Sequence, residues 1–406
     1  MRLMKKTILA SIIDPAKEDN SFYEDECRSL CEQAGYDIVV STVQKLRKPI
    51  PGFAFGKGKI ETIKTLIDET EAEAVVINNY LRYDVLKNLS EEFGVEVIDR
   101  FQLILNIFRL HASSKEAKLQ IEIASLRYMS GYRDETHGSD DQQGGTLHNR
   151  GSGESYSSLY RKRNKKKIEI LENELSELKK RKEITYRKRR DSLLKRVVLV
   201  GYTNAGKSSL MNAMVDREDK KVLAEDRLFA TLDTGTRYIN YRHYGFILSD
   251  SVGFVSDLPH ALIQSFRSTL DIINEADLLI HVIDSSNKDY QAQKEVTENT
   301  LKEIHADHIP RLDLYHKCDL AVDTEHDHIS SVYIQSTIDD LLNNIIETLY
   351  PAEQVCKVKV PVSRLYQLQP FYEICSLNEI ETVDDYTIYE VTGEQTTVDR
   401  LMKLFE

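Results

Sequence analysis

The sequence predicts a multidomain α/β protein of two or three domains, because 406 residues are more than a single core usually holds. Over residues 1–112, short apolar runs rich in β-branched residues alternate with helix-length segments, which is typical of parallel strands in an α/β layer. Farther along, the apolar run 196–200 leads into a glycine-bearing turn and a helix start, the order found in phosphate-binding α/β domains.

The predicted N-terminal α/β subdomain covers residues 1–112. Its expected helices lie near 20–34, 58–70 and 82–93, and its expected strands are Ile8–Ile13, Asp37–Ser41, Ala74–Asn78 and Val95–Ile98. The segment Gly52–Lys59 opens one helix and could bind an anion at the helix N-terminus, although a plain turn is the favoured interpretation.

A helical hairpin is predicted over residues 113–195. Apolar positions fit a helical period from about 101 to 130, and a polar, Gly-rich tip loop follows at 131–158. The next helix carries Ile168, Leu171, Leu175 and Leu178 at 3-4-3 spacing, which predicts a coiled-coil-like seam. Loops this long are usually functional or disordered, and the Arg150 side chain with the loop's glycines suits insertion into folded RNA.

Charge is distributed unevenly along the chain. The net charge is −12, yet residues 161–196 hold sixteen Lys and Arg against six Asp and Glu, a local charge of +10. A basic arm on an acidic body suggests a face for phosphate-rich partners, while a solvated helix face remains the alternative. The five cysteines are scattered without metal spacing, which indicates a reduced, cytoplasmic compartment, and no stretch is long enough to span a membrane.

The stretch Gly201–Ser208 matches the phosphate-loop pattern G-x-x-x-x-G-K-[ST]. Backbone N–H groups at the turn and the positive end of the helix would hold phosphate oxygens. Lys207 is expected to reach the β- and γ-phosphates, and the Ser208 hydroxyl to occupy one position on Mg²⁺. A chance Gly-rich turn is the alternative, which the preceding strand disfavours.

Switch residues are expected downstream of this loop. Asp250 follows a predicted strand at a distance that suits a second acidic group beside Mg²⁺, and the Gly253 backbone N–H could report the γ-phosphate. Thr231, after Phe229, is the candidate for a mobile Thr that closes on Mg²⁺, with an ordinary loop Thr as the alternative. Phe254 stands where a water-orienting Gln is expected, so turnover should be slow and depend on a partner.

Base recognition is expected after the strand 311–315. The Asp319 carboxylate can accept both N–H groups of the guanine edge, and the Lys317 stem can lie on the base; this favours GTP over ATP. His316 stands where guanine-binding proteins usually carry Asn or Thr, and the Ser336 backbone, at the expected end of a last strand, could approach the base oxygen.

The order of these elements predicts a Ras-like P-loop GTPase domain over 196–350. The tail, 354–406, is expected to form a small α+β domain with the order strand, helix, strand, strand, helix. The candidate catalytic residues are Lys207, Thr231 and Gly253. The metal ligands are Ser208, Thr231 and Asp250. The candidate GTP-binding residues are Gly201, Tyr202, Thr203, Asn204, Ala205, Gly206, Lys207, Ser208, Ser209, Phe229, Thr231, Asp250, Gly253, His316, Lys317, Asp319 and Ser336.

Several longer stretches carry a resemblance to a known family. They are Gly56–Glu61, Val97–Leu105, Lys118–Glu122, Gly144–Glu154, Gly201–Ser208, Phe229–Asp233 and Asp250–His260. With them the chain closely resembles the HflX family of ribosome-associated GTPases over nearly its full length. The resemblance implies a GTP hydrolase that uses Mg²⁺, binds the 50S subunit and splits stalled 70S ribosomes, as a cytoplasmic protein expected to be monomeric.

The same resemblance implies that the tip loop reaches the peptidyl-transferase region. Its candidate ribosomal RNA contacts are Gly144, Gly145, Asn149, Arg150, Gly151 and Gly153. Departures from the family pattern include Ser152 and Thr234, where Pro is usual, and the polar stretch 135–140, so the chain is expected to be a divergent member. One hypothesis is that its altered tip acts on drug-stalled ribosomes. Two alternatives stay open: a nucleotide-gated binding module with little turnover, and, ranked last because residues 1–195 hold no Walker A pattern, an ATP-driven RNA remodeller.

Overall fold

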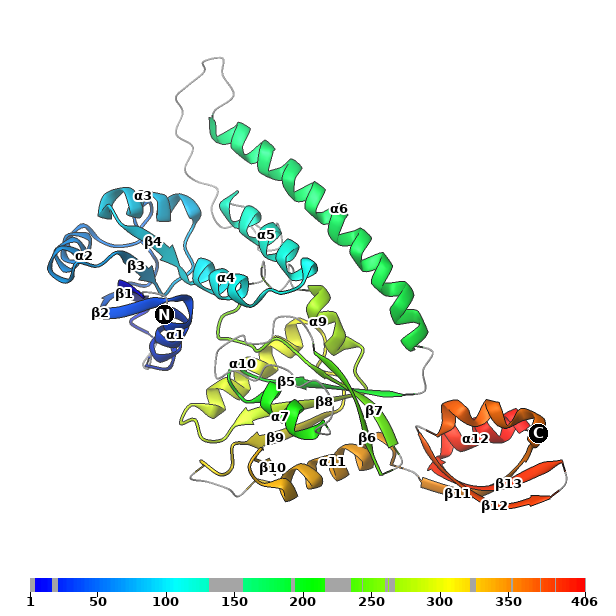
Figure 1. Cartoon of the computed structure of the whole chain (residues 1–406). Helices are drawn as coiled ribbons and strands as arrows, with labels where there is room; N and C mark the ends of the chain where they lie inside the picture. Colours follow the sequence, from blue (N-terminus) through cyan, green and yellow to red (C-terminus); the bar gives the residue numbers. More distant parts are fainter. Residues whose placement is uncertain are drawn as a thin grey trace. The chain divides into compact units, whose positions relative to one another are not determined.

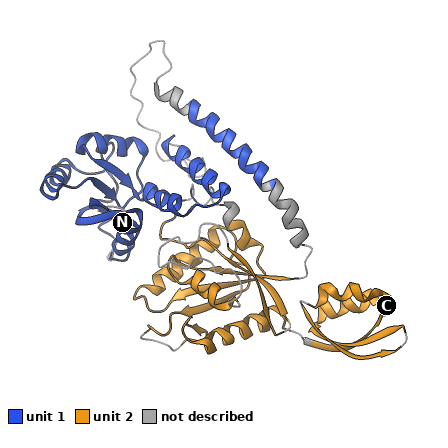
Figure 2. Cartoon of the chain, viewed as in Figure 1, with its two compact units in different colours: residues 1–180, 258–266 blue, residues 181–257, 267–406 orange. Residues whose placement is uncertain are grey.

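The structure is a computed structural model that describes residues 4–16, 21–130, 156–190, 194–215, 235–242, 244–259, 262, 267–321, 326–351, 353–372, 374–383 and 385–405. The chain divides into two compact units, one of residues 1–180 with 258–266 and the other of residues 181–257 with 267–406 (Figure 2). The bounds of the four domains expected from the sequence stay predictions.

A four-stranded parallel sheet forms the first part of unit 1 (Figure 1). Its strand order is β2-β1-β3-β4, and residues such as Ile8, Ile63 and Leu89 are fully buried between sheet and helices. The predicted strands and helices are confirmed as β1 (Lys5–Ile13), α1 (Ser21–Ala34), β2 (Tyr36–Lys45), α2 (Lys57–Thr70), β3 (Ala74–Ile77), α3 (Tyr83–Phe93) and β4 (Glu96–Asp99). The turn before α2 is tied locally, because the Gly56 N–H donates to the Gln44 side chain at 3.0 Å.

The helical pattern predicted as continuous from 101 to 130 is two helices, α4 (Arg100–His111) and α5 (Lys115–Met129). The break has a local cause. The Ser114 hydroxyl accepts the Ala117 N–H at 3.1 Å and caps α5, and such caps favour a new helix start over continuation.

The predicted hairpin seam is confirmed between α5 and the 35-residue helix α6 (Tyr156–Arg190). Because α6 begins at Tyr156, the predicted end of the tip loop at 158 is wrong, and residues 156–158 are helical. Leu119 and Ile123 of α5 form one apolar cluster with Ile168 and Leu171 of α6. The two helices are antiparallel, because residue numbers fall on one as they rise on the other along the pairs Ser130–Asn164, Glu122–Lys167 and Lys115–Glu174. At its C-terminal end, α5 is tied to the sheet by Tyr128, whose hydroxyl donates to Asp99 Oδ2 at 2.7 Å.

Unit 2 contains a six-stranded sheet of order β10-β9-β8-β5-β7-β6, parallel except for β6. The strands β5, β7 and β8 share a buried core with α7 and α11. The elements are β5 (Lys195–Val200), α7 (Lys207–Met214), β6 (Thr236–Tyr241), β7 (Tyr244–Asp250), α9 (Arg267–Asn274), β8 (Leu278–Asp284), α10 (Tyr290–Glu303), β9 (Arg311–His316), β10 (Ile329–Ser330) and α11 (Gln335–Leu349). Strand-to-helix turns at the carboxyl ends of parallel strands are where α/β sheets bind ligands.

The last strand of this sheet was placed wrongly by the sequence pattern. The strand ends at Ser330, and the expected strand position of Ser336 lies in the first turn of α11. The buried apolar residues Ile338, Leu341, Leu342 and Ile345 follow at helical spacing, and their burial against the sheet favours the helix.

The C-terminal residues follow the predicted order of elements, although the second element is a 3₁₀-helix. The three strands form an antiparallel sheet of order β11-β13-β12. Its elements are β11 (Glu353–Pro361), η1 (Val362–Phe371), β12 (Cys375–Val383), β13 (Tyr386–Glu394) and α12 (Gln395–Phe405). Among the described residues, no helix combines the length and the apolar character needed to cross a bilayer.

Candidate functional site

The phosphate loop connects β5 to α7 and requires glycine at two positions. Gly201 has a φ of +148°, and a Cβ atom there would lie 2.3 Å from the Val282 carbonyl oxygen. Gly206, the N-cap of α7, has a φ of +96°, which only glycine adopts without strain. The loop can therefore turn tightly over the edge of the sheet, with the start of α7 facing the space where an anion would bind.

Lys207 lies folded back across this loop. Its Nζ donates to the carbonyl oxygens of Gly201 at 3.0 Å and Tyr202 at 2.7 Å, and the residue is only 6% exposed. Burial lowers the pKa of Lys207 to about 8, while the charge of Asp250 acts in the opposite direction. The ammonium group is thus held at the loop, where a bound phosphate would stabilise its charged form.

Two oxygen ligands meet at the start of α7 and the end of β7. The Ser208 hydroxyl donates to Asp250 Oδ2 at 2.5 Å, and Asp250 is fully buried. Mg²⁺ prefers a few protein oxygens together with substrate phosphates, so this pair fits that ion. Nearby, the Thr203 hydroxyl oxygen is buried without a hydrogen-bond partner in the described part of the chain, which fits a site where a bound ligand supplies the partner.

The segment after Asp250 is paired directly with the phosphate loop. The Thr203 N–H donates to the Phe254 carbonyl at 2.8 Å, and the Phe254 N–H donates to the Gly201 carbonyl at 3.1 Å. Gly253 is pressed so closely on the loop that a Cβ atom would lie 2.8 Å from Thr203 Cα and 3.1 Å from Lys207 Nζ. The Phe254 side chain is 1% exposed, so it belongs to the core and cannot polarise a water molecule.

The base-reading residues follow β9. Lys317 Nζ donates to the Asn204 carbonyl at 3.0 Å and forms an ion pair with Asp284 at 2.7 Å, which ties this turn to the phosphate loop. Asp319 is exposed and available to a base. His316 is buried, and its Nδ1 lies 2.8 Å from Ser330 Oγ. Ser330 is a residue that the sequence pattern missed, because a two-residue strand gives too short a signal.

The structure brings together most of the predicted residues. Residues 201–209 form the loop and the start of α7, and Asp250 and Gly253 lie against them. His316, at the end of β9, and Lys317, directly after it, contact the same loop. Ser336 is exposed on α11 and does not end a strand. Eight predicted residues lie outside the described residues: Phe229, Thr231, Gly144, Gly145, Asn149, Arg150, Gly151 and Gly153.

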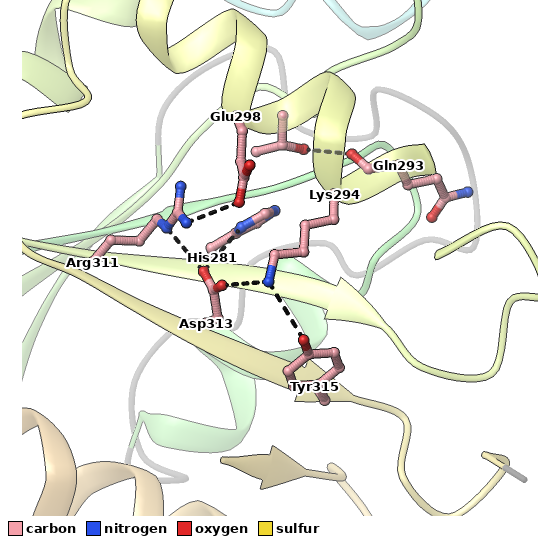
Figure 3. A network of polar contacts seen from close by, with 8 residues as sticks. His281, Gln293, Lys294, Glu298, Arg311, Asp313 and Tyr315 are labelled. Carbon is pink, nitrogen blue, oxygen red and sulfur yellow. Dashed lines mark hydrogen bonds and ion pairs between the residues drawn. The ribbon is translucent and has the colours of Figure 1, made fainter. Parts of the chain in front are cut away.

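A second polar cluster joins β8, β9 and α10 (Figure 3). His281, Glu298 and Asp313 are close enough to hold a metal ion, but Arg311 pairs with both carboxylates at 2.9 Å and Lys294 pairs with Asp313 at 2.7 Å. Burial raises the pKa of Asp313, but hydrogen bonds from His281 and Lys294 outweigh it and hold that pKa well below its usual range. The two cations already neutralise the carboxylates, so this cluster braces β9 against α10.

Comparisons with known proteins agree with this geometry. Family models match residues 23–109 (GTP-binding GTPase N-terminal), 111–190 (GTP-binding GTPase Middle Region) and 196–316 (50S ribosome-binding GTPase). The GTPase HflX of Alkalihalophilus pseudofirmus is 36% identical over 369 residues, covering 89% of this chain and 84% of that protein. The GTPase HflX of Caldanaerobacter subterraneus subsp. tengcongensis is 33% identical over 365 residues, with the same coverage of 89% and 84%.

Among solved structures, a GTP-binding protein from the archaeon Sulfolobus solfataricus in complex with GDP matches with a TM-score of 0.44 and 25% identity, covering 84% of this chain and 89% of that one. The matches to the two curated relatives, at 36% and 33% identity over most of both chains, are sufficient to assign the family, and the geometry of the phosphate loop agrees with it. The chain belongs to the HflX family of GTPases and is a GTP hydrolase.

Proposed function

We propose that this GTP hydrolase binds the 50S subunit and splits or rescues stalled 70S ribosomes, with the tip loop reaching the peptidyl-transferase region. The observation that carries the proposal is a cluster of exposed cations, Arg163, Lys165 and Lys166, in the first turns of α6 directly after that loop. Clustered Lys and Arg neutralise RNA phosphates and release counterions, which gives salt-dependent affinity. The family model that matches 196–316 carries the description of a 50S ribosome-binding GTPase.

In this proposal the N–H groups from 206 to 208, at the end of the loop and the start of α7, bind the phosphates, and Lys207 places its charge beside the β- and γ-phosphates. Ser208 and Asp250, with Thr231, would hold Mg²⁺, which would supply positive charge to neutralise the phosphates. Gly253 presents its N–H to the γ-phosphate, and Asp319 accepts the guanine N–H groups. Because Phe254 is buried, the group that orients the attacking water comes from elsewhere, which favours hydrolysis stimulated by the ribosome.

GTP turnover by the purified protein, alone and with 50S subunits or 70S ribosomes, tests the enzyme and its partner together. We expect a large rise in the rate with ribosomal particles and GTP, and no rise with ATP as substrate. Tight GTP binding without any ribosome-dependent rise would overturn partner-stimulated hydrolysis and favour a nucleotide-gated switch, the second candidate, which the burial of Phe254 supports. Equal use of ATP would contradict the role of Asp319.

The hairpin's role is tested separately by charge removal. The double variant Arg163→Gln/Lys166→Gln should weaken cosedimentation with 50S subunits. It should also reduce the slope of log affinity against log salt concentration by about one to two, because each residue is expected to contact one phosphate. Lys180→Gln is the matched control on the same helix, since Lys180 pairs with Glu177 at 2.9 Å. An equal loss in both variants would contradict a specific RNA contact near the tip.

The proposal includes two further points. The protein works as a cytoplasmic monomer, and its divergent tip deals with drug-stalled ribosomes. Antibiotic sensitivity of a strain that lacks the gene tests the second point, and unchanged sensitivity would count against it.

A further inference from the structure

His316 stands where guanine-binding proteins usually carry Asn or Thr, and its ring lies between Ser330 and Gly206. The residue ends β9 and is 2% exposed. Its carbonyl oxygen accepts the Ser285 N–H at 3.0 Å and the Ser285 hydroxyl at 2.7 Å. On the side chain, Nδ1 lies 2.8 Å from Ser330 Oγ on β10. Two neighbouring segments of the sheet edge therefore fix both the backbone and the orientation of the ring.

The opposite edge of the ring lies against the phosphate loop. A Cβ atom on Gly206 would fall 2.5 Å from His316 Cδ2 and 2.8 Å from Nε2, so ring and glycine are in direct contact. Gly206 is the residue at which the loop becomes α7, immediately before Lys207. A displacement of the ring would therefore also displace the turn that orients the N–H groups at the start of α7.

The next residue supports the same loop from the same strand end. Lys317 Nζ donates to the Asn204 carbonyl at 3.0 Å. Consecutive residues of one turn, His316 and Lys317, hold two loop residues, Gly206 and Asn204, and this sets the distance between the base-reading turn and the phosphate loop.

We propose that His316 is a positioning residue: it reads no part of the base, and with Ser330 it holds the phosphate loop in the shape that binds the diphosphate group, which GDP shares with other nucleoside diphosphates. Guanine selection then rests on Asp319, which is exposed beyond the buried ring. The inference rests on the proposed nucleotide site and adds a division of labour within it, since one residue of the turn supports affinity and another supports selectivity.

The protonation state of the ring agrees with this role. Burial, followed by the charge of Lys317, lowers the pKa of His316 to about 4, while Asp284 and Asp319 act in the opposite direction. The ring is therefore neutral at pH 7, so Nδ1 and the Ser330 hydroxyl form an ordinary hydrogen bond without adding a charge beneath the loop.

The test compares dissociation constants for GDP and inosine 5′-diphosphate (IDP), whose base lacks the guanine 2-amino group. We expect His316→Ala to weaken both ligands by the same factor, roughly tenfold for a lost buried hydrogen bond and packing contact, and to leave the GDP/IDP ratio unchanged. Asp319→Ala should instead bring that ratio close to one, because the acceptor for the 2-amino group is lost. A changed ratio in His316→Ala would overturn the proposal and make His316 a base reader.

Three further variants separate positioning from a general loss of folding. His316→Asn keeps a polar atom near Ser330 and should recover part of the affinity. Ser330→Ala should weaken both ligands in the wild-type background but add little to His316→Ala, because the two groups share one bond. His328, just before β10, contacts Asn344, and His328→Ala, which removes that contact, is the matched control and should bind normally. If the wild type binds neither ligand, the proposed nucleotide site itself fails; if it binds but His316→Ala, His316→Asn and Ser330→Ala all bind equally well, only the present inference fails.

Discussion

Replacing Gly253 with Ala tests how closely the segment after Asp250 is applied to the phosphate loop. The added methyl group would lie 2.8 Å from both Cα and Cγ2 of Thr203 and 3.1 Å from Lys207 Nζ. Thr203 cannot move aside without breaking hydrogen bonds, because its N–H donates to the Phe254 carbonyl and the Phe254 N–H donates to the Gly201 carbonyl. The substitution must therefore strain this pairing or separate the two segments.

Overpacking of this kind costs about 1–3 kcal/mol, and opening two backbone hydrogen bonds costs a similar amount. If the cost of about 1–3 kcal/mol is added to the activation free energy, because Gly253 must be placed at the γ-phosphate for hydrolysis, the rate of GTP hydrolysis should fall by roughly 5- to 150-fold. GDP carries no γ-phosphate, so its affinity should change by only about twofold. Single-turnover hydrolysis with saturating ribosomes and a GDP titration measure the two quantities on one preparation.

Gly58→Ala is the matched control, because a Cβ atom on Gly58, in the first turn of α2, meets nothing within 4 Å. Normal hydrolysis by Gly253→Ala would refute the close approach, since the methyl group would then have found room. Equal losses of GDP and GTP binding would refute the assignment of Gly253 to the γ-phosphate side of the site.

Three further predictions concern the metal ligand, the hairpin and a buried carboxylate. Ser208→Ala should raise the Mg²⁺ concentration for half-maximal hydrolysis about tenfold, because it removes the hydroxyl 2.5 Å from Asp250; an unchanged Mg²⁺ titration would contradict this. Leu171→Ala should lower the free energy of unfolding of unit 1 by about 2–4 kcal/mol in denaturant titrations of the full chain, because Leu171 is buried in the hairpin seam; a loss below about 1 kcal/mol would mean that the seam does not hold the hairpin. Burial raises the pKa of Asp99 to about 6, so the stability from this carboxyl is complete below its usual pKa and is lost as pH rises through 6. Relative to Asp99→Asn, the wild type should lose up to about 3 kcal/mol between pH 4 and pH 7 in urea unfolding, and a pH-independent difference would refute the raised pKa.

Local patterns were sufficient for most of the fold. The four N-terminal strands are short β-branched runs, and α5 and α6 pair through apolar residues spaced at helical intervals. The phosphate loop was equally readable, because a tight turn between a strand and a helix needs glycine at defined positions such as Gly206. Each of these features depends on residues that are close neighbours in the sequence.

The features that the sequence did not reveal depend on distant or competing contacts. The apolar period across 101–130 gave no sign of the N-cap at Ser114, where a side-chain hydrogen bond starts a new helix although the apolar pattern continues. Ser336 was placed on a strand because the real strand, at Ser330, is only two residues long. The contact of His316 with Gly206 joins residues far apart in the chain, and no local spacing encodes which way a buried ring turns.

The strand orders of the two larger sheets imply that the sheets are completed at different stages of synthesis. The sheet of order β2-β1-β3-β4 is complete once residue 99 has left the ribosomal exit tunnel, so the N-terminal subdomain can fold while the rest of the chain is being made. In the six-stranded sheet, β5 is made first but lies in the middle, between β7 and β8. The phosphate loop therefore cannot be held in place until β7 and β8 have been synthesised, and we expect nucleotide to bind only late in translation.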